Sequence, residues 1–323
     1  MRQISYAEAM VEALDEIMGG DERVSLIGSY FLGLSPRRVL LTKLQEKYPG
    51  RTFDPPIAEA AYCGLGIGAA MAGERPIVDV ATASFLFQAI QQVCNEAANA
   101  HYMSGGQIKV PVVFHILHGI RGGGAAQHSH SPQAMLWNTP GLQIMLPSSP
   151  QDVKGLLKTA VASDNPTMFV DHVKLFEVVG PVPDDCLAIP FGIANVVRKG
   201  TDLTIVATSH MVQRSLRAAD LLQAEGFSIE VVDMRTLVPF DKDTLLKSVA
   251  KTGHLVIADE GHLSCGVSAE IAAIVAEEGS QYLRTPLKRV ATPDIPIPFS
   301  PPLEKFIDPG EEKIMAAVRE VLK

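Results

Sequence analysis

Apolar residues recur every three or four positions at the start of the chain, which is the spacing of one face of a helix. Ser5 and Glu8 form the capping-box pattern that begins many helices. Gly19 and Gly20 follow the last apolar position, where glycine typically ends a helix. The apolar positions are Ala7, Met10, Val11, Leu14, Ile17 and Met18. The pattern therefore predicts an N-terminal amphipathic helix.

The rest of the first half alternates between short apolar runs and longer segments with helical spacing. Short, continuously apolar runs are typical of strands buried on both faces of a parallel sheet. We expect strands at 24–27, 76–80, 110–117, 143–146 and 167–170, and helices at 36–48, 85–102 and 152–162. A further helix after Glu59 carries Gly64, Gly66 and Gly68. Because glycine is costly inside a helix, we expect this helix to lie close against another backbone or a ligand.

A second alternating segment follows a proline- and acid-rich stretch at 173–190. Strands are expected at 203–207, 229–232, 255–258 and 287–290, with helices at 212–225, 244–251 and 267–276 between them and a last helix at 311–322. Alternation of this kind predicts a parallel sheet covered by helices. We therefore predict two α/β domains, at residues 1–185 and 186–323.

Composition agrees with a globular protein and narrows its partners. The 323 residues are 47% hydrophobic and 20% charged, and the net charge is −8. A nucleic-acid or anionic-membrane binder would need a basic surface, so both classes are disfavoured. The first residues lack the apolar run of a signal peptide, and the four cysteines are widely spaced. We therefore expect a reduced, cytoplasmic protein, with the cysteines filling small spaces in the core.

Glu59 is the first residue with candidate chemistry, because it begins a predicted helix among apolar residues. The residues alone leave two interpretations open. One is an acid in the first helical turn that complements the helix dipole. The other is a carboxylate kept in an apolar setting to hold or move a proton. Phe85 begins the helix at 85–102, where the simplest expectation is core packing.

Four of the nine histidines, His115, His118, His128 and His130, lie in one short stretch. The stretch also contains a loop with four glycines. Flexible backbone and imidazoles that titrate near neutral pH are typical of a catalytic loop. Two alternatives remain open. A zinc site would need a ligand from elsewhere to complete the familiar mixed sets, since the stretch has no cysteine or acid; the other alternative is a polar surface loop.

Several segments, through their order and spacing, resemble those of one family. They are Asp54-Pro55-Pro56-Ile57-Ala58-Glu59, Tyr102-Met103-Ser104-Gly105-Gly106, Ala125-Ala126-Gln127-His128-Ser129, Pro140-Gly141-Leu142, Lys154-Gly155-Leu156-Leu157, Asp233-Met234-Arg235-Thr236-Leu237 and Ser248-Val249-Ala250-Lys251-Thr252-Gly253. From about Ile4 to its end, the chain resembles the beta subunit of the thiamine-diphosphate-dependent first component of 2-oxo acid dehydrogenase complexes. The resemblance implies a pyrimidine-binding domain followed by a transketolase C-terminal-like domain.

The resemblance also implies roles for four side chains. Glu59 matches the glutamate that bonds the aminopyrimidine ring nitrogen of thiamine diphosphate, where a shared proton favours the tautomer that activates the cofactor. Phe85 matches the aromatic that stacks on that ring, and Tyr102 is expected in the same pocket. His128 matches a loop histidine that faces the reacting end of the cofactor, where it handles protons or the substrate carboxylate and assists acyl transfer to lipoamide.

The chain has no Gly-Asp-Gly segment, through which thiamine-diphosphate enzymes hold the diphosphate and Mg²⁺ by oxygen ligation. In the family, that segment lies on an alpha subunit. The resemblance therefore implies an obligate alpha partner that holds Mg²⁺ and an α2β2 heterotetramer with a second beta subunit. It also implies a dihydrolipoamide acyltransferase that receives the acyl group.

The family often holds a structural potassium ion through backbone carbonyls. The matching positions here are Val112, Ala160, Val161, Ser163 and Asn165. Every residue has a backbone carbonyl, so the residue types at these positions do not indicate an ion. Potassium at these positions is implied by the resemblance alone.

Departures from the family pattern cluster around the expected pocket. Ser29 and Tyr30 stand where acidic residues are usual, Pro55 where a Thr is usual, Gln91 where an Asp is usual, His115 where an Arg is common, and His130 where a Gln is common. These changes favour an unusual substrate or reduced activity.

The sequence thus predicts the beta subunit of a thiamine-dependent 2-oxo acid (pyruvate-type) or acetoin dehydrogenase, active with an alpha subunit. One alternative is a split transketolase-like or acyloin-forming enzyme outside these complexes. Another is a non-catalytic scaffold that binds the acyltransferase core.

Overall fold

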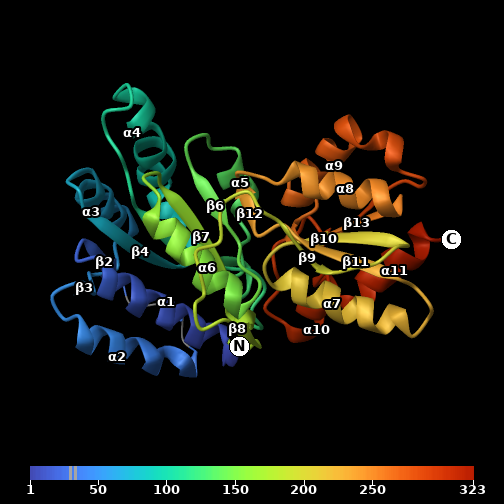
Figure 1. Cartoon of the computed structure of the whole chain (residues 1–323), viewed down its shortest axis with the longest axis horizontal. Helices are drawn as coiled ribbons and strands as arrows, with labels where there is room; N and C mark the ends of the chain where they lie inside the picture. Colours follow the sequence, from blue (N-terminus) through green and yellow to red (C-terminus); the bar gives the residue numbers. More distant parts are fainter. Residues whose placement is uncertain (29–30, 33–34) are drawn as a thin grey trace. The chain divides into compact units, whose positions relative to one another are not determined.

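The computed structural model describes residues 1–28, 31–32 and 35–323. The chain divides into two units (Figure 1). Unit 1 contains Met1–His118 and Met135–Phe191, and unit 2 contains Gly119–Ala134 and Gly192–Lys323. The units separate between Phe191 and Gly192, shortly after the stretch in which the sequence places a domain boundary, and the glycine-rich loop goes with unit 2. Ser29 and Tyr30 lie outside the described residues.

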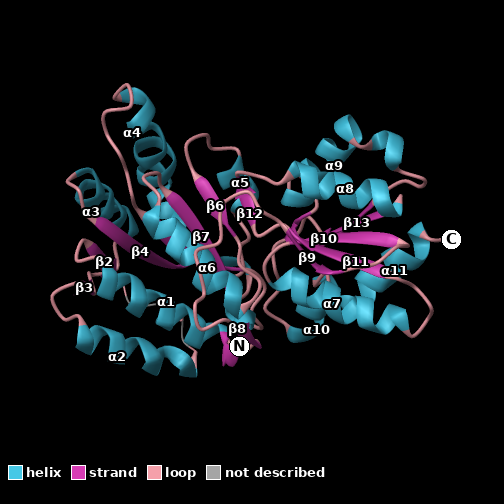
Figure 2. Ribbon diagram, in the orientation of Figure 1, coloured by secondary structure: helices cyan, strands magenta, loops and turns pink. Residues whose placement is uncertain are grey.

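Unit 1 is built on parallel strands in the order β6-β7-β5-β4-β2-β3 (Figure 2). These strands are β2 (Val24–Ile27), β3 (Thr52–Phe53), β4 (Arg75–Thr82), β5 (Val113–His118), β6 (Gln143–Met145) and β7 (Thr167–His172). A separate antiparallel pair joins β1 (Arg2–Ser5) to β8 (Val179–Val182). The helices are α1 (Tyr6–Gly20), α2 (Val39–Lys47), α3 (Glu59–Met71), α4 (Ala98–Met103) and α6 (Pro150–Ala162), with short turns η1 (Pro36–Arg38) and η5 (Val173–Leu175). The short helix α5 (Gln133–Trp137) begins in unit 2 and ends in unit 1. The predicted strands of the first half are confirmed.

The capping box at the start of α1 is formed as predicted. The Ser5 hydroxyl accepts a hydrogen bond from the Glu8 N–H at 3.2 Å, and the Glu8 carboxylate accepts one from the Ser5 N–H at 2.8 Å. The apolar face of α1 is buried, and the helix packs against α6. Lys154 of α6 is buried and donates to Glu12 at 2.9 Å and to Glu16 at 2.6 Å, so this contact also carries a paired charge.

Glycine lets α3 lie close against β4, as the sequence suggested. A Cβ atom on Gly66 would lie 2.4 Å from Cγ2 of Val78, which is buried. A Cβ atom on Gly68, in the same helix, would meet no heavy atom within 4 Å. The close approach therefore depends on Gly66 rather than on every glycine of the helix.

Gly66→Ala is expected to lower the free energy of unfolding by about 1–3 kcal/mol, because an added methyl overpacks a buried contact. Gly68→Ala is the matched control, since alanine there gains up to about 1 kcal/mol of helix propensity without a clash. Urea unfolding of both variants measures the difference. Equal stabilities would show that Gly66 is not needed for the approach of α3 to β4.

The single helix expected at 85–102 is wrong in form. The segment comprises a 3-10 helix η2 (Ala83–Ala89), a π-helical segment η3 (Gln91–Ala97) and only then α4. Leu86, Val93 and Ala97 are buried, so the predicted apolar stripe is real. A stripe of this spacing does not distinguish α from π hydrogen bonding, because both bury the same face over two turns. π-helical segments often occur at functional sites.

Unit 2 contains a second sheet in the order β14-β13-β10-β11-β9. Its first four strands are parallel, and β9 is an antiparallel edge. The strands of this sheet are β9 (Asn195–Arg198), β10 (Leu203–Ala207), β11 (Ile229–Asp233), β13 (Leu255–His262) and β14 (Lys288–Thr292). The short strand β12 (Thr236–Val238) belongs to the same unit but not to this sheet. The helices are α7 (His210–Gln223), α8 (Lys242–Thr252), α9 (Val267–Glu278), α10 (Pro301–Ile307) and α11 (Glu311–Val321), with short turns η4 (Ala126–His128) and η6 (Ser280–Tyr282). In Figure 2, α7 and α11 cover one face of the sheet and α8 and α9 the other.

The cysteines only partly fill the core as expected. Cys63 and Cys186 are buried and Cys94 is half-buried, but Cys265 is exposed. The expectation was wrong for Cys265, which follows β13 in a loop with a left-handed backbone, φ 55°. All four are free thiols.

Candidate active site

Glu59 is the first residue of α3 and is 8% exposed. No side chain caps this end of the helix, so its first turn is open to a negative charge from Glu59 itself. Burial, with the charge of Glu59 adding to it, raises the pKa of the Cys63 thiol to about 12. Burial and then Glu59 also raise the pKa of Tyr62. The Glu59 carboxylate is therefore buried beside two groups whose ionisation its charge disfavours.

Phe85 lies in η2, directly after β4, and is half-buried. The turn that leads to it is fixed by Asp79, whose carboxylate accepts a hydrogen bond from the Ala81 N–H at 3.0 Å. Ala81 has a left-handed backbone with φ 63°. Because α3 packs against η2, the structure brings the element that carries Glu59 against the one that carries Phe85.

Tyr102 lies near the end of α4 and is 84% exposed. Its ring is therefore not enclosed within unit 1, and its place in the cofactor pocket stays a prediction. Gln91, one of the departures from the family pattern, is exposed and donates to the Glu96 carboxylate at 3.1 Å.

His128 ends the turn η4 and is exposed. The loop that carries it, residues 119–130, belongs to unit 2. Its ends are joined by a hydrogen bond from the Gly119 N–H to the His130 carbonyl at 3.0 Å. His130 is half-buried, and burial together with the charge of His262 lowers its pKa, which favours the neutral imidazole.

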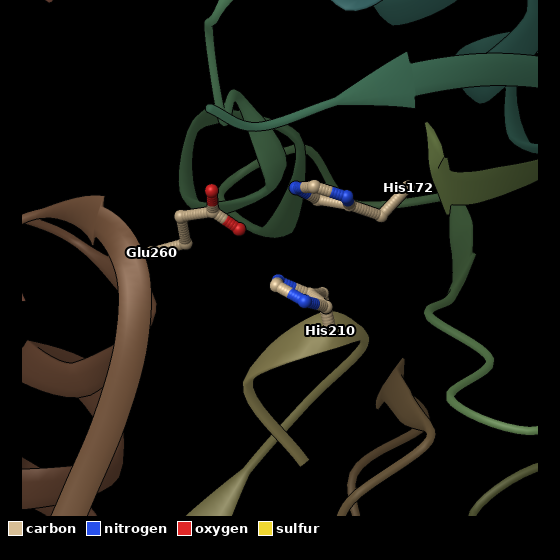
Figure 3. A group of neighbouring side chains, drawn as sticks. All are labelled: His172, His210 and Glu260. Carbon is tan, nitrogen blue, oxygen red and sulfur yellow. The ribbon is translucent and has the colours of Figure 1, made fainter. Parts of the chain in front are cut away.

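Two buried groups near this loop were not singled out from the sequence. Figure 3 shows Glu260, near the end of β13, and His210, the first residue of α7. A carboxylate oxygen and a ring nitrogen of this pair lie within 4.8 Å of each other. Glu260 lies near the carboxyl end of β13 and His210 follows β10. Ligand sites of α/β folds gather at the carboxyl ends of parallel strands. That rule was the available signal for them.

His115 is the centre of a buried charged network in unit 1. Its Nδ1 lies 3.0 Å from the Asp79 carboxylate and its Nε2 lies 3.0 Å from the Asp171 carboxylate. Tyr6 hydrogen-bonds to Asp171, and Phe31 stacks on the imidazole with 5.0 Å between ring centroids. Burial lowers the pKa of His115, but the bonds to Asp171 and Asp79 outweigh it and raise the pKa to about 9. The imidazole is therefore a cation held between two carboxylates.

His118 and His172 form a second buried pair in unit 1. They are register partners at the ends of β5 and β7, and their rings meet edge to face with centroids 5.0 Å apart. His172, also labelled in Figure 3, accepts a hydrogen bond at Nδ1 from the Lys174 N–H at 3.1 Å.

Within each unit, the described residues show no zinc site built from the histidine-rich stretch. Among the described residues, none of His115, His118, His128 and His130 belongs to a group of three or more metal-ligand side chains within ligand distance. His115 and His118 are three residues apart on one strand, so their side chains leave opposite faces of the sheet.

The carbonyls expected to hold potassium already have donors. The Arg75 guanidinium donates to the Val161 and Ser163 carbonyls, at 2.8 Å each. The Val112 carbonyl accepts from the Thr167 N–H at 2.9 Å. A carbonyl oxygen has two lone pairs. Each of these carbonyls can therefore accept its hydrogen bond and still bind a potassium ion, but it is also satisfied without the ion.

Among the described residues, no helix combines the length and the apolar character needed to cross a membrane.

Two family models match the chain. They are the transketolase pyrimidine binding domain, over residues 2–177, and the transketolase C-terminal domain, over residues 192–314. The pyruvate dehydrogenase E1 component subunit beta of Rickettsia felis is 41% identical over 320 residues, which cover 99% of this chain and 98% of that protein. The acetoin:2,6-dichlorophenolindophenol oxidoreductase subunit beta of Cupriavidus necator is 40% identical over 332 residues, covering 100% of this chain and 98% of the relative. A solved structure of a split gene transketolase, an inactive beta4 tetramer, is 25% identical with a TM-score of 0.80 and covers 99% of this chain and 98% of its own.

These matches define a transketolase-type protein, with a pyrimidine-binding domain followed by a transketolase C-terminal domain. Within that class, the chain belongs to the family of beta subunits to which the pyruvate dehydrogenase E1 and acetoin oxidoreductase subunits belong. The family and the fold class predicted from the sequence are thereby confirmed.

Proposed function

We propose that the chain is the catalytic beta subunit of a thiamine-diphosphate-dependent 2-oxo acid or acetoin dehydrogenase. The observation that carries the proposal is the buried carboxylate of Glu59 at the open start of α3, inside the segment that matches a pyrimidine-binding domain. Full-length identity of 40–41% to beta subunits of this kind supports it. Cytoplasmic location is part of the same proposal.

The residues of unit 1 fit the pyrimidine end of the cofactor. Glu59 would hold a proton at the ring nitrogen, and the half-buried Phe85 would offer a face to the ring. When bound, thiamine diphosphate supplies a nucleophilic carbon that attacks the oxo group of the substrate. His128, on an exposed turn of unit 2, would take or give a proton or bind the substrate carboxylate.

An alpha subunit would supply Mg²⁺ and the diphosphate anchor, since no Gly-Asp-Gly segment occurs in this chain. Exposed large apolar side chains occur on the elements that carry the proposed site: Leu65, Phe87, Tyr102 and Met103, with Ile57 just before α3. Where such side chains form one contiguous patch, the patch marks a contact with a partner. An α2β2 enzyme that passes its acyl group to a dihydrolipoamide acyltransferase follows from this proposal.

The test is co-expression with a candidate alpha chain that carries Gly-Asp-Gly. We expect a stable complex that reduces a dye in the presence of thiamine diphosphate, Mg²⁺ and pyruvate, a branched-chain 2-oxo acid or acetoin. A stable complex that is inactive with all of these substrates would contradict the proposal. Aldehyde transfer without lipoamide would instead favour a split transketolase-type enzyme, which the solved relative suggests as the second candidate.

Potassium at Val112, Ala160, Val161, Ser163 and Asn165 is part of the proposal and makes a separate prediction. Thermal unfolding in KCl is expected at a higher Tm than in choline chloride of equal ionic strength, because an ion that binds the folded state stabilises it. Equal Tm values would show that no potassium binds at these carbonyls.

A further inference from the structure

We propose that Glu304 and Glu260 are positioning residues that hold the backbone of the loop at residues 119–130, and through it fix where His128 points. This inference rests on the proposed function, since it assumes that His128 serves the reaction. All of the contacts that carry it lie within unit 2.

Two buried carboxylates accept hydrogen bonds from backbone N–H groups of the loop. The Glu260 Oε1 accepts a hydrogen bond from the Ile120 N–H at 2.7 Å, and the Glu304 Oε2 accepts one from the Gly123 N–H at 2.9 Å. Glu260 is 6% exposed and Glu304 is 8% exposed. Hydrogen bonds from N–H groups to a carboxylate are among the stronger ones in proteins, so two of them three residues apart fix both position and direction.

An apolar contact also holds the loop against the rest of unit 2. Ile120 is 1% exposed and forms a small cluster with Ile297 and Ile307. Ile307 is the last residue of α10, the helix that carries Glu304. The loop is therefore attached to α10 by a carboxylate and by an isoleucine, which makes it part of unit 2 rather than a free connection.

The backbone of the loop after Gly123 has a strained conformation that the surrounding residues must stabilise. Ala125, directly before η4, has φ 51° and ψ −165°, a region that residues other than glycine rarely adopt. At Gly124, a Cβ atom would lie 2.6 Å from the Ser129 Oγ and 3.1 Å from the His128 carbonyl oxygen. Strain of this kind remains only where the surroundings determine the backbone. The two carboxylates hold the loop at the Ile120 and Gly123 N–H groups, eight and five residues before His128.

Glu304 is the sharper target for the test, because Glu260 also lies near the Arg121 charge and His210. Glu304→Gln keeps an oxygen that accepts the Gly123 N–H, whereas Glu304→Ala removes it. Glu312→Ala, an exposed glutamate one helix further on, is the matched control. All variants are prepared as complexes with the alpha chain, and their Tm values establish that they are folded.

Hydrogen exchange of the loop amides and steady-state turnover are then measured. In Glu304→Ala we expect exchange at Gly123 to rise about tenfold or more, kcat to fall, and KM for the oxo substrate to change little. Glu304→Gln should restore both exchange and kcat towards the wild type, and Glu312→Ala should match the wild type throughout.

Unchanged hydrogen exchange at Gly123 in Glu304→Ala would show that Glu304 does not hold the loop backbone. Faster exchange with unchanged kcat would show that holding the loop does not position His128 for the reaction. If the wild-type complex shows no dehydrogenase activity at all, the proposed function fails. The exchange measurement still decides in that case whether Glu304 holds the loop, so the two failures are distinguishable. Should Glu304→Ala fail to fold, Glu260→Gln against Glu260→Ala gives the same comparison at the Ile120 N–H.

Discussion

Glu59→Gln is expected to reduce turnover of the assembled alpha–beta enzyme about 10²–10⁴-fold, because an amide cannot take or give the proton that a carboxylate exchanges with the pyrimidine ring. The side chains are nearly equal in size, so packing at the start of α3 should survive. The free energy of unfolding should not fall, since the change removes a buried charge that has to be desolvated. Dye reduction at saturating cofactor and substrate measures the effect.

Glu22→Gln is the control for this loss, because Glu22 is an exposed glutamate in a turn of the same unit. Size-exclusion chromatography of both variants with the alpha chain shows whether assembly is intact. A Glu59→Gln complex with wild-type turnover would sink the catalytic role. That result would instead favour the alternative in which the chain is a non-catalytic scaffold.

The regular part of the fold could be predicted because its elements carry local signals. Strand β10 lies where its apolar run predicted it, and α1 begins with the capping box seen in the sequence. The pairs that sequence reading missed are short strands whose partners are distant. Strand β1 pairs with β8 over more than 170 residues, and strands of four residues each are too short to indicate such a pairing.

The residues of the candidate site also fall into those that the sequence could indicate and those that it could not. Glu59, Phe85 and His128 could be named because each lies in a segment whose order and spacing resemble a family, and that family is now shown. Glu260 and Glu304 could not, because they reach the loop from positions 140 and 181 residues away. A single glutamate at the end of a strand or in a short helix carries no sign of the amide that it will meet.

His115→Leu is expected to lower the free energy of unfolding by about 3–5 kcal/mol, because it leaves two buried carboxylates without the cation between them. Leucine fills a similar volume, so the loss reports the charge rather than a cavity. The matched control is His101→Leu, an exposed histidine of the same unit. Urea unfolding at neutral pH measures both, and a change below about 1 kcal/mol for His115→Leu would show that the network is not a charged one.

The pH dependence of that stabilisation separates a charged from a neutral imidazole. The folded chain keeps the proton of His115 up to a pKa of about 9, whereas the unfolded chain releases it near the ordinary value of 6.5. The stabilisation is therefore fully present below about pH 6.5 and is lost as the pH rises through about 9. The difference between the two pKa values corresponds to about 3 kcal/mol of folding stability. Wild type minus His115→Leu, measured in urea at several pH values, isolates this contribution from groups that titrate in both proteins. Parallel stability curves over that range would mean that the folded chain holds His115 neutral.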